Sequence, residues 1–144
     1  MIYTKMTKLA LKLCFEAHKE QTDKCGIPYV FHPFHLAEQM TDENTVAVAL
    51  LHDVVEDTDV TLEDLREAGF TDQVVEAVAL MTHSPDVPYM DYVAAIKTNP
   101  IARAVKLADL RHNSDLTRFD RELTPWDIAR AEKYANAIRL LETE

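Results

Sequence analysis

Glycine is scarce in this chain, where it accounts for only 2 of the 144 residues. Tight turns and β-hairpins depend on glycine, because their backbone takes conformations that other residues adopt poorly. A fold rich in β-sheet is therefore not expected. Alanine and leucine are plentiful instead, and 47% of the residues are hydrophobic. This composition predicts an all-α globular domain and argues against a disordered chain.

Positive charge is also in short supply, with 15 Lys and Arg against 25 Asp and Glu and a net charge of −10. A general binder of nucleic acid or of a membrane surface needs basic patches, so we expect neither kind of partner. A small phosphorylated ligand stays open, because it needs only a local cluster of cations. The 2 cysteines, Cys14 and Cys25, form neither a metal-type pair nor a disulfide framework.

Long apolar runs are absent, and residues 1–6 lack the hydrophobic core of a signal peptide. We therefore expect a cytoplasmic protein. The length suits one domain with its own core, and we find no repeat, linker or low-complexity segment. Residues 1–144 are interpreted as a single domain, and the sequence leaves open whether it forms a homo-oligomer.

Apolar residues recur at helical spacing along most of the chain. Capping residues mark the expected helix starts: Thr61 or Asp59, Thr71, Asn99 with Pro100, and Thr124. A central helix is apolar on all sides over residues 46–51, which implies complete burial. The last helix is expected to bury Trp126. The pattern predicts a bundle of about seven or eight helices, over residues 4–20, 33–40, 43–57, 61–67, 72–81, 88–98, 100–118 and 125–141.

Ionisable side chains gather at the end of the central helix. In a helix, His52, Asp53, Glu56 and Asp57 would share one face, spread over about 140° at about 100° per residue. Carboxylates this close repel one another and lose hydration when buried. Such an arrangement calls for a cation or a shared proton.

Two further residues complete a candidate metal site. His32 ends a loop that starts at residue 21, and Asp109 lies among apolar neighbours in a later helix. Two imidazoles and two carboxylates suit Mn²⁺, Fe²⁺ or Zn²⁺. Such an ion lowers the pKa of bound water and polarises a phosphoryl oxygen. The candidate ligands are His32, His52, Asp53 and Asp109.

Glu56 and Asp57 come one turn further on and are candidates for general acid–base catalysis or for orienting water. The alternative is a simple ion pair of His52 and Asp53 at a helix end, with Asp109 as a surface charge. The apolar neighbours of Asp109 argue against this, since a lone buried carboxylate is costly.

Three strings of residues stand out: Lys24-Cys25-Gly26-Ile27-Pro28-Tyr29 with His32-Pro33, then His52-Asp53-Val54-Val55-Glu56-Asp57, then Val105-Lys106-Leu107-Ala108-Asp109 with His112-Asn113. Together they resemble the HD-superfamily hydrolase domain of the RelA/SpoT homologues, and most closely the small alarmone hydrolases, which consist of this domain alone. The resemblance covers nearly the whole chain. Glu-Asp after His-Asp separates this branch from most other HD phosphohydrolases.

The resemblance implies an all-α HD bundle that uses Mn²⁺ and removes the 3′-pyrophosphate of guanosine tetra- or pentaphosphate by attack of a metal-bound water. It implies the same four metal ligands, His32, His52, Asp53 and Asp109. It assigns the attacking water to the acidic pair, Glu56 and Asp57. It implies nucleotide contacts from Lys24, Asn113 and, at a position matched less closely, Tyr134.

The sequence departs from the family near the implied nucleotide pocket. Asp23 stands before Lys24 where the family usually has Arg, and His83 stands where Lys is common. Two alternatives therefore stay open: a hydrolase of another phosphorylated nucleotide, such as a dinucleotide cofactor phosphate, and a catalytically silent nucleotide-binding module. The local cations expected to attract an anion are Lys24, Lys97, Arg103, Lys106 and Arg111, and Lys106 is also a candidate substrate-binding residue.

Overall fold

The computed structural model describes residues 1–143, and in this range every regular element is a helix apart from one isolated β-bridge between Thr22 and Pro28. The prediction of an all-α fold is confirmed. The elements are α1 (Lys5–His18), α2 (Phe31–Glu38), α3 (Glu43–Leu51), α4 (Val54–Asp57), α5 (Leu62–Ala68), α6 (Asp72–Met81), α7 (Tyr89–Lys97), α8 (Pro100–Asn113), the 3₁₀ helix η1 (Leu116–Arg118) and α9 (Pro125–Glu142).

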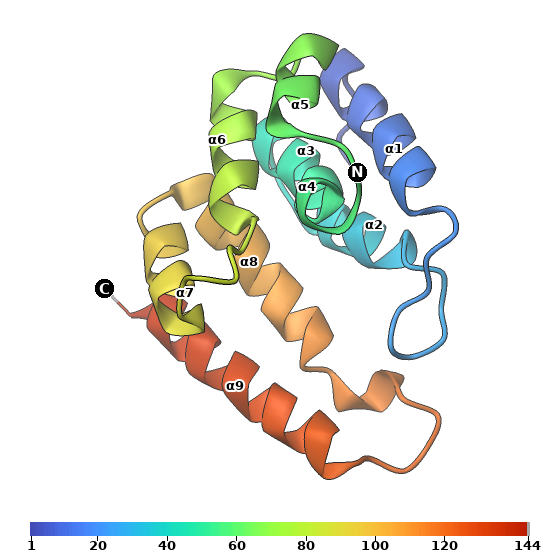
Figure 1. Ribbon diagram of the computed structural model, residues 1–144. Coiled ribbons are helices and arrows are strands. Elements are labelled where there is room, and N and C mark those ends of the chain that lie inside the picture. Colours follow the sequence, from blue (N-terminus) through green and yellow to red (C-terminus); the bar gives the residue numbers. More distant parts are fainter. Residues whose placement is uncertain (144) are drawn as a thin grey trace.

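Helix α3 is the centre of the bundle and packs against α1, α2, α6 and α8 (Figure 1). Residues 46–51 of this helix are at most 1% exposed, as their uniformly apolar sequence predicts. The polar residues that follow directly, His52 and Asp53, therefore begin inside the bundle.

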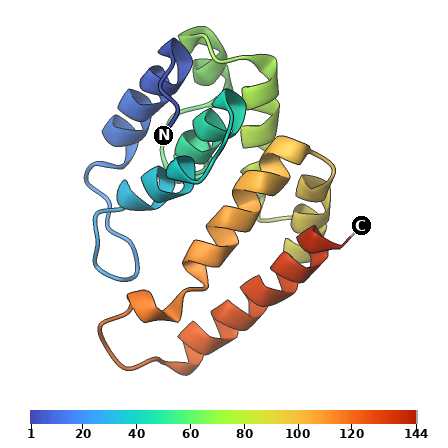
Figure 2. The same ribbon diagram turned by 180° about the vertical axis from the view of Figure 1, so that it is seen from behind.

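Helices α8 and α9 form a long antiparallel pair, joined by the segment that contains η1 (Figure 2). Helix α7 packs against both of them. Helix α8 also contacts α2, α3 and α6, so it connects this pair to the half of the bundle built on α3.

Capping side chains set the helix boundaries. Thr61, Thr71, Asn99 and Thr124 each accept a hydrogen bond from a backbone N–H in the first turn of the following helix, as the sequence predicts. Gly69 ends α5 with a φ of 106°, a left-handed conformation that favours glycine.

The prediction of one continuous helix over residues 43–57 is wrong. Helix α3 ends at Leu51, His52 and Asp53 form a turn, and α4 begins at Val54. His52 Nδ1 donates to the backbone oxygen of Ala49 at 2.7 Å. In a continuous helix this oxygen would accept from the N–H of Asp53, so the side chain competes with the helix for its acceptor.

Two predictions about the last third of the chain are also wrong. The helix expected over 100–118 ends at Asn113, and η1 follows as a separate turn. Trp126 is 81% exposed and not buried. Thr124 and Asp127 form a capping box that turns Asp127 inward, so the neighbouring Trp126 faces outward.

The described helices include none with the length and apolar character needed to cross a membrane. The single-domain organisation, the cytoplasmic location and the oligomeric state stay predictions of the sequence.

Candidate active site

The four predicted metal ligands converge from three segments of the chain. His32 lies in the first turn of α2, which begins two residues earlier than expected, and Asp109 lies in α8. His32 Nε2 is 2.8 Å from Asp109 Oδ1. His52 Nε2 is 3.1 Å from Asp53 Oδ2 and 3.5 Å from Asp109 Oδ1. Asp109 is only 4% exposed, so the alternative of a surface charge is excluded.

His52 is held with one nitrogen free to bind a cation. Its Nδ1 donates to the backbone oxygen of Ala49, which leaves the lone pair on Nε2. Among the described residues, Nε2 has no hydrogen-bond partner although it is buried. Burial opposes protonation of His52, but Asp53 and Asp109 outweigh it and raise its pKa well above the usual value. This nitrogen therefore requires a positive charge, either a proton or a metal ion.

His32 has a partner that the sequence analysis did not identify. Its Nδ1 lies 2.6 Å from Nδ1 of His112, on α8. Burial and the neighbouring His32 lower the pKa of His112 to about 4, so His112 is neutral near pH 7. When His32 Nδ1 donates to His112, the lone pair of His32 Nε2 faces Asp109.

Asp109 is held as a carboxylate by two neighbours on its own helix. Lys106 Nζ donates to Asp109 Oδ2 at 2.9 Å, and Asn113 Nδ2 donates to Asp109 Oδ1 at 2.9 Å. Burial opposes ionisation, but Lys106 and the two histidines hold the pKa of Asp109 well below its usual range. Lys106 and Asn113, both predicted to contact a nucleotide, are thus part of the support of this carboxylate.

Three carboxylates, one of them the candidate ligand Asp53, form an acidic group at the site. Ligand oxygens of Asp53, Glu56 and Asp57 lie within 4.8 Å of one another. Tyr29 donates a hydrogen bond to Asp53, and Glu56 Oε1 accepts from the backbone N–H of His83 at 2.6 Å. Burial raises the pKa of Glu56, although the bond from His83 opposes the shift. Burial and then Asp53 raise the pKa of Asp57.

The residues present fit a divalent cation. His32, His52 and Asp109 offer ligand atoms that lie within 4.8 Å of one another, and Asp53 adds a carboxylate next to His52. Imidazole and carboxylate groups suit Mn²⁺, Fe²⁺ and Zn²⁺, and the unpartnered nitrogen of His52 is explained by such an ion.

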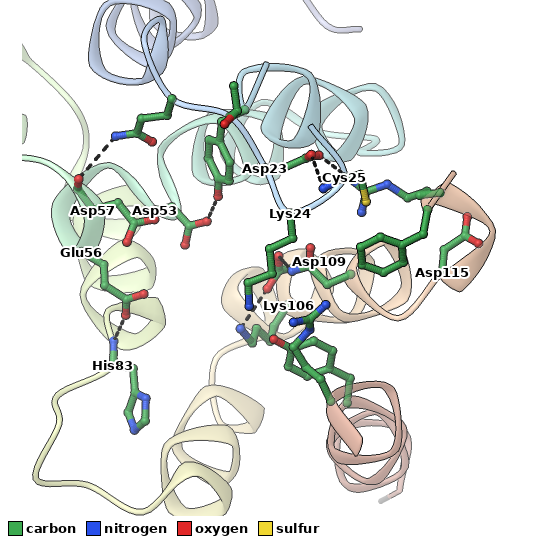
Figure 3. Close-up of a pocket in the computed structure, with 18 of the residues that line it drawn as sticks. Asp23, Lys24, Cys25, Asp53, Glu56, Asp57, His83, Lys106, Asp109 and Asp115 are labelled. Atoms are coloured by element: carbon green, nitrogen blue, oxygen red, sulfur yellow. Dashed lines mark hydrogen bonds and ion pairs between the residues drawn. The ribbon is translucent and has the colours of Figure 1, made fainter. Parts of the chain in front are cut away.

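Asp53 and Asp109, together with Glu56 and Asp57, line a cavity of about 690 Å³, which is large enough for a nucleotide. In Figure 3 the carboxylates of Asp53, Glu56 and Asp57 lie together on one side of the cavity. The remaining walls carry aromatic and basic side chains together with Asp23 and Asp115. The cavity-lining residues of these two kinds are Lys24, Tyr29, Tyr89, Tyr92, Lys106, Arg118, Phe119, Arg130 and Tyr134.

All four residues predicted to contact substrate line this cavity: Lys24, Lys106, Asn113 and Tyr134. The expectation for the other local cations is wrong. Lys97 and Arg103 line a separate pocket, and Arg111 pairs with Glu142. These side chains belong to faces of α7 and α8 that turn away from the cavity.

Arg118 and Arg130 line the cavity and were not singled out from the sequence. Arg130 lies four residues before Tyr134 in α9, a spacing that places both on one helical face and could have indicated its position. Arg118 follows α8 in the irregular segment around η1, where no periodicity points to it.

Comparison with known proteins gives a consistent result. Residues 10–112, which include all four candidate ligands, match the model of the family described as HD domain. The mouse guanosine-3′,5′-bis(diphosphate) 3′-pyrophosphohydrolase MESH1 is 35% identical over 136 residues, covering 83% of this chain and 74% of that protein. The human MESH1 is 35% identical over 131 residues, covering 81% and 72%.

A longer relative is also similar. The guanosine-3′,5′-bis(diphosphate) 3′-pyrophosphohydrolase of Aquifex aeolicus is 33% identical over 136 residues, and this chain spans only 18% of its length. A solved structure, described as a metazoan ortholog of SpoT that hydrolyzes ppGpp, superposes with a TM-score of 0.76 at 25% identity and covers 99% of this chain and 88% of that one. The chain belongs to the HD-domain family, in the group that contains the MESH1 and SpoT proteins.

Proposed function

We propose that this chain is a metal-dependent hydrolase that removes the 3′-pyrophosphate from guanosine tetra- or pentaphosphate. The observation that carries the proposal is the convergence of His32, His52, Asp53 and Asp109 beside the acidic pair at one wall of a nucleotide-sized cavity. The relatives named for this reaction, at 33% to 35% identity, support the choice of substrate.

The proposed ion is Mn²⁺, held by His32, His52, Asp53 and Asp109, with Fe²⁺ or Zn²⁺ as alternatives. A divalent ion there would supply Lewis-acid polarisation of a phosphoryl oxygen and a lowered pKa for water. Lys106 and Asn113 keep Asp109 ionised and oriented, and Tyr29 orients Asp53. The protein thus prepares the ligand set before the ion arrives.

Glu56 is proposed as the general base that takes a proton from the attacking water, and Asp57 as the group that orients this water. The backbone N–H of His83 binds Oε1 of Glu56, which fixes the carboxylate and leaves Oε2 as a proton acceptor. A pKa raised by burial makes Glu56 a stronger base than an exposed glutamate.

The nucleotide is proposed to lie in the cavity with its phosphates near Lys24, Lys106 and Arg130 and its rings or sugar against Tyr134 and Asn113. These residues combine positive charge with apolar and hydrogen-bonding surface, which a phosphorylated nucleotide requires. The cavity lining carries six carboxylates against four Lys and Arg side chains, so the proposed metal ion would supply part of the positive charge that an anionic nucleotide requires.

A second candidate is hydrolysis of another phosphorylated nucleotide, such as a dinucleotide cofactor phosphate. The observation that favours it is Asp23, which places an acidic residue on the cavity wall where related domains have a cation. A silent nucleotide-binding module is less well supported, because such a module has no use for the buried charges around His52.

The decisive experiment incubates the purified protein with Mn²⁺ and guanosine tetraphosphate and measures pyrophosphate release. We expect release that stops when the ion is chelated and that is lost in Asp53→Ala. Turnover of other 3′- or 2′-phosphorylated nucleotides, without turnover of guanosine tetraphosphate, would favour the second candidate. Tight nucleotide binding without any turnover would favour the silent module.

A further inference from the structure

Asp23 closes the turn that carries Lys24, in the loop between α1 and α2. Its Oδ1 accepts hydrogen bonds from the backbone N–H groups of Cys25, at 2.8 Å, and Ile27, at 3.0 Å. The backbone N–H of Asp23 donates to the carbonyl oxygen of Ile27 at 2.8 Å. Lys24 is therefore anchored on both sides, and its direction depends on the geometry of this turn.

The other carboxylate oxygen of Asp23 connects the turn to a distant segment. Asp23 Oδ2 lies 2.6 Å from Nη2 of Arg118, the last residue of η1. Nη1 of Arg118 donates to the backbone oxygen of His112 at 3.0 Å, at the end of α8. The Asp23 and Arg118 side chains are 12% and 16% exposed. Arg118 thus joins the turn to the helix that carries Asp109.

The position of Arg118 suits this connecting role. A cation at the C-terminal end of a helix is favoured by the exposed carbonyl groups there, and a guanidinium can bind two acceptors in different directions. Because Asp23 already balances its charge, Arg118 adds little net positive charge to the cavity. Lys24 and Arg130, which both line the cavity, are then the residues left to attract phosphate groups near Arg118.

We propose that the Asp23–Arg118 pair is a positioning device that holds Lys24 in the cavity and so determines how tightly the site binds the anionic part of its nucleotide. The inference rests on the proposed function for the identity of the ligand, but not for the structural role of the pair. It assigns a purpose to the acidic residue at position 23, which the hydrolytic chemistry leaves without one.

Three substitutions separate the parts of this arrangement. Arg118→Met removes the connection, Asp23→Asn removes its charge but keeps an oxygen for the N–H groups of Cys25 and Ile27, and Asp23→Ala removes both. The matched control is Arg111→Met, which breaks the 2.5 Å pair of Arg111 with Glu142 outside the cavity lining. Circular dichroism establishes that each variant is folded.

Two readouts are needed. Steady-state kinetics with guanosine tetraphosphate and Mn²⁺ report KM and kcat. The rate constant for alkylation of the Cys25 thiolate by iodoacetamide, taken from the pH dependence of the rate so that changes in the thiol pKa are separated, reports the order of the turn. Cys25 is half-buried there, while Cys14 is buried in the core. Alkylation does not depend on catalysis, so it distinguishes a positioning role from a chemical one.

We expect Arg118→Met to raise KM about tenfold while kcat changes less than about twofold. The reason is that the loss of one charged hydrogen bond weakens binding by roughly a factor of ten. Cys25 should be alkylated several times faster. Asp23→Ala should show the larger effect on alkylation and Asp23→Asn the smaller one. Arg111→Met should leave KM and alkylation at the wild-type values.

The proposal is overturned if Arg118→Met leaves both KM and alkylation unchanged. It is also overturned if Asp23→Asn lowers KM, because a released Arg118 would then be binding the nucleotide directly. If the wild-type chain turns over no nucleotide, the proposed function fails. The pair is then still judged by alkylation and by calorimetry with inorganic pyrophosphate, whose binding Arg118→Met must weaken.

Discussion

The Nδ1 atoms of His32 and His112 lie 2.6 Å apart, with the two rings nearly parallel at 9°. His112 follows Asp109 by three residues in α8, so one helix supplies both a candidate ligand and the partner of another. A metal-binding histidine commonly donates its second N–H to a fixed acceptor, which sets its tautomer and ring orientation. His112 is in the position to be that acceptor for His32.

Replacing His112 by alanine should therefore weaken metal binding. We expect the affinity for Mn²⁺ to fall by roughly 10- to 100-fold, because His32 would lose the contact that orients its ring. Calorimetric or electron paramagnetic resonance titration of Mn²⁺ measures this directly. His35→Ala is the control, since the exposed His35 ring packs against His112 but makes no hydrogen bond to the candidate ligands. Equal affinities in all three proteins would rule out the role of His112.

Lys106 should contribute most to the stability of the protein when no metal is bound. Lys106→Met leaves the buried Asp109 carboxylate without its cation, so we expect the free energy of unfolding of the metal-free protein to fall by about 3 kcal/mol. Urea denaturation in the presence of a chelator measures the loss.

Added Mn²⁺ should recover more stability in this variant than in the wild type, because the ion replaces part of the missing positive charge near Asp109. Lys8→Met, on the exposed face of α1, should change neither quantity. A Lys106→Met protein as stable as the wild type without metal would contradict the electrostatic account of Asp109.

Glu56→Gln tests the assignment of the general base. The amide retains an oxygen for the N–H of His83 but cannot accept the proton, so we expect folding and Mn²⁺ affinity to be unchanged. The value of kcat should fall by about 100-fold or more. Glu63→Gln, which changes an exposed side chain on α5, is the control. A fully active Glu56→Gln enzyme would show that another group removes the proton.

The stability of the protein in acid should depend on Asp127. Hydrogen bonds from Arg121 and then from the backbone of Thr124 hold the pKa of Asp127 well below its usual range. A folded-state pKa below the unfolded one adds stability above the unfolded value, near 4, and this stability is lost as the pH falls further.

We therefore expect Asp127→Asn to be less stable than the wild type at pH 7, with a difference that shrinks as the pH falls below about 4. Urea denaturation at several pH values measures both proteins under the same conditions. Glu132→Gln, exposed on the same helix, should track the wild type throughout. A difference that is independent of pH would point to packing and not to the charge of Asp127.

Much of the fold follows from interactions between residues close in sequence. The scarcity of glycine, the helical spacing of apolar residues and the caps at Thr61, Thr71 and Asn99 each depend on one or two helical turns, and all appear as predicted. The burial of residues 46–51 was predictable for the same reason, because a helix that is apolar on all sides has no face for solvent.

The failures have an equally local cause when examined in the structure. The break at His52 comes from a side chain that takes a backbone acceptor, and the exposure of Trp126 comes from the inward turn of Asp127. The spacing of hydrophobic residues predicts neither the helix break nor the exposed tryptophan. It counts a histidine only as a polar position and a tryptophan only as an apolar one.

The sequence by itself determined which chemical groups are available: two histidines, four carboxylates and two lysines in patterns that suit a divalent ion and a phosphorylated ligand. Only the tertiary structure decided which of them meet. The contacts of His32 with Asp109 and His112, and of Asp23 with Arg118, span 77 to 95 residues. Contacts of this kind form only when helices pack, and no periodicity along the chain encodes them.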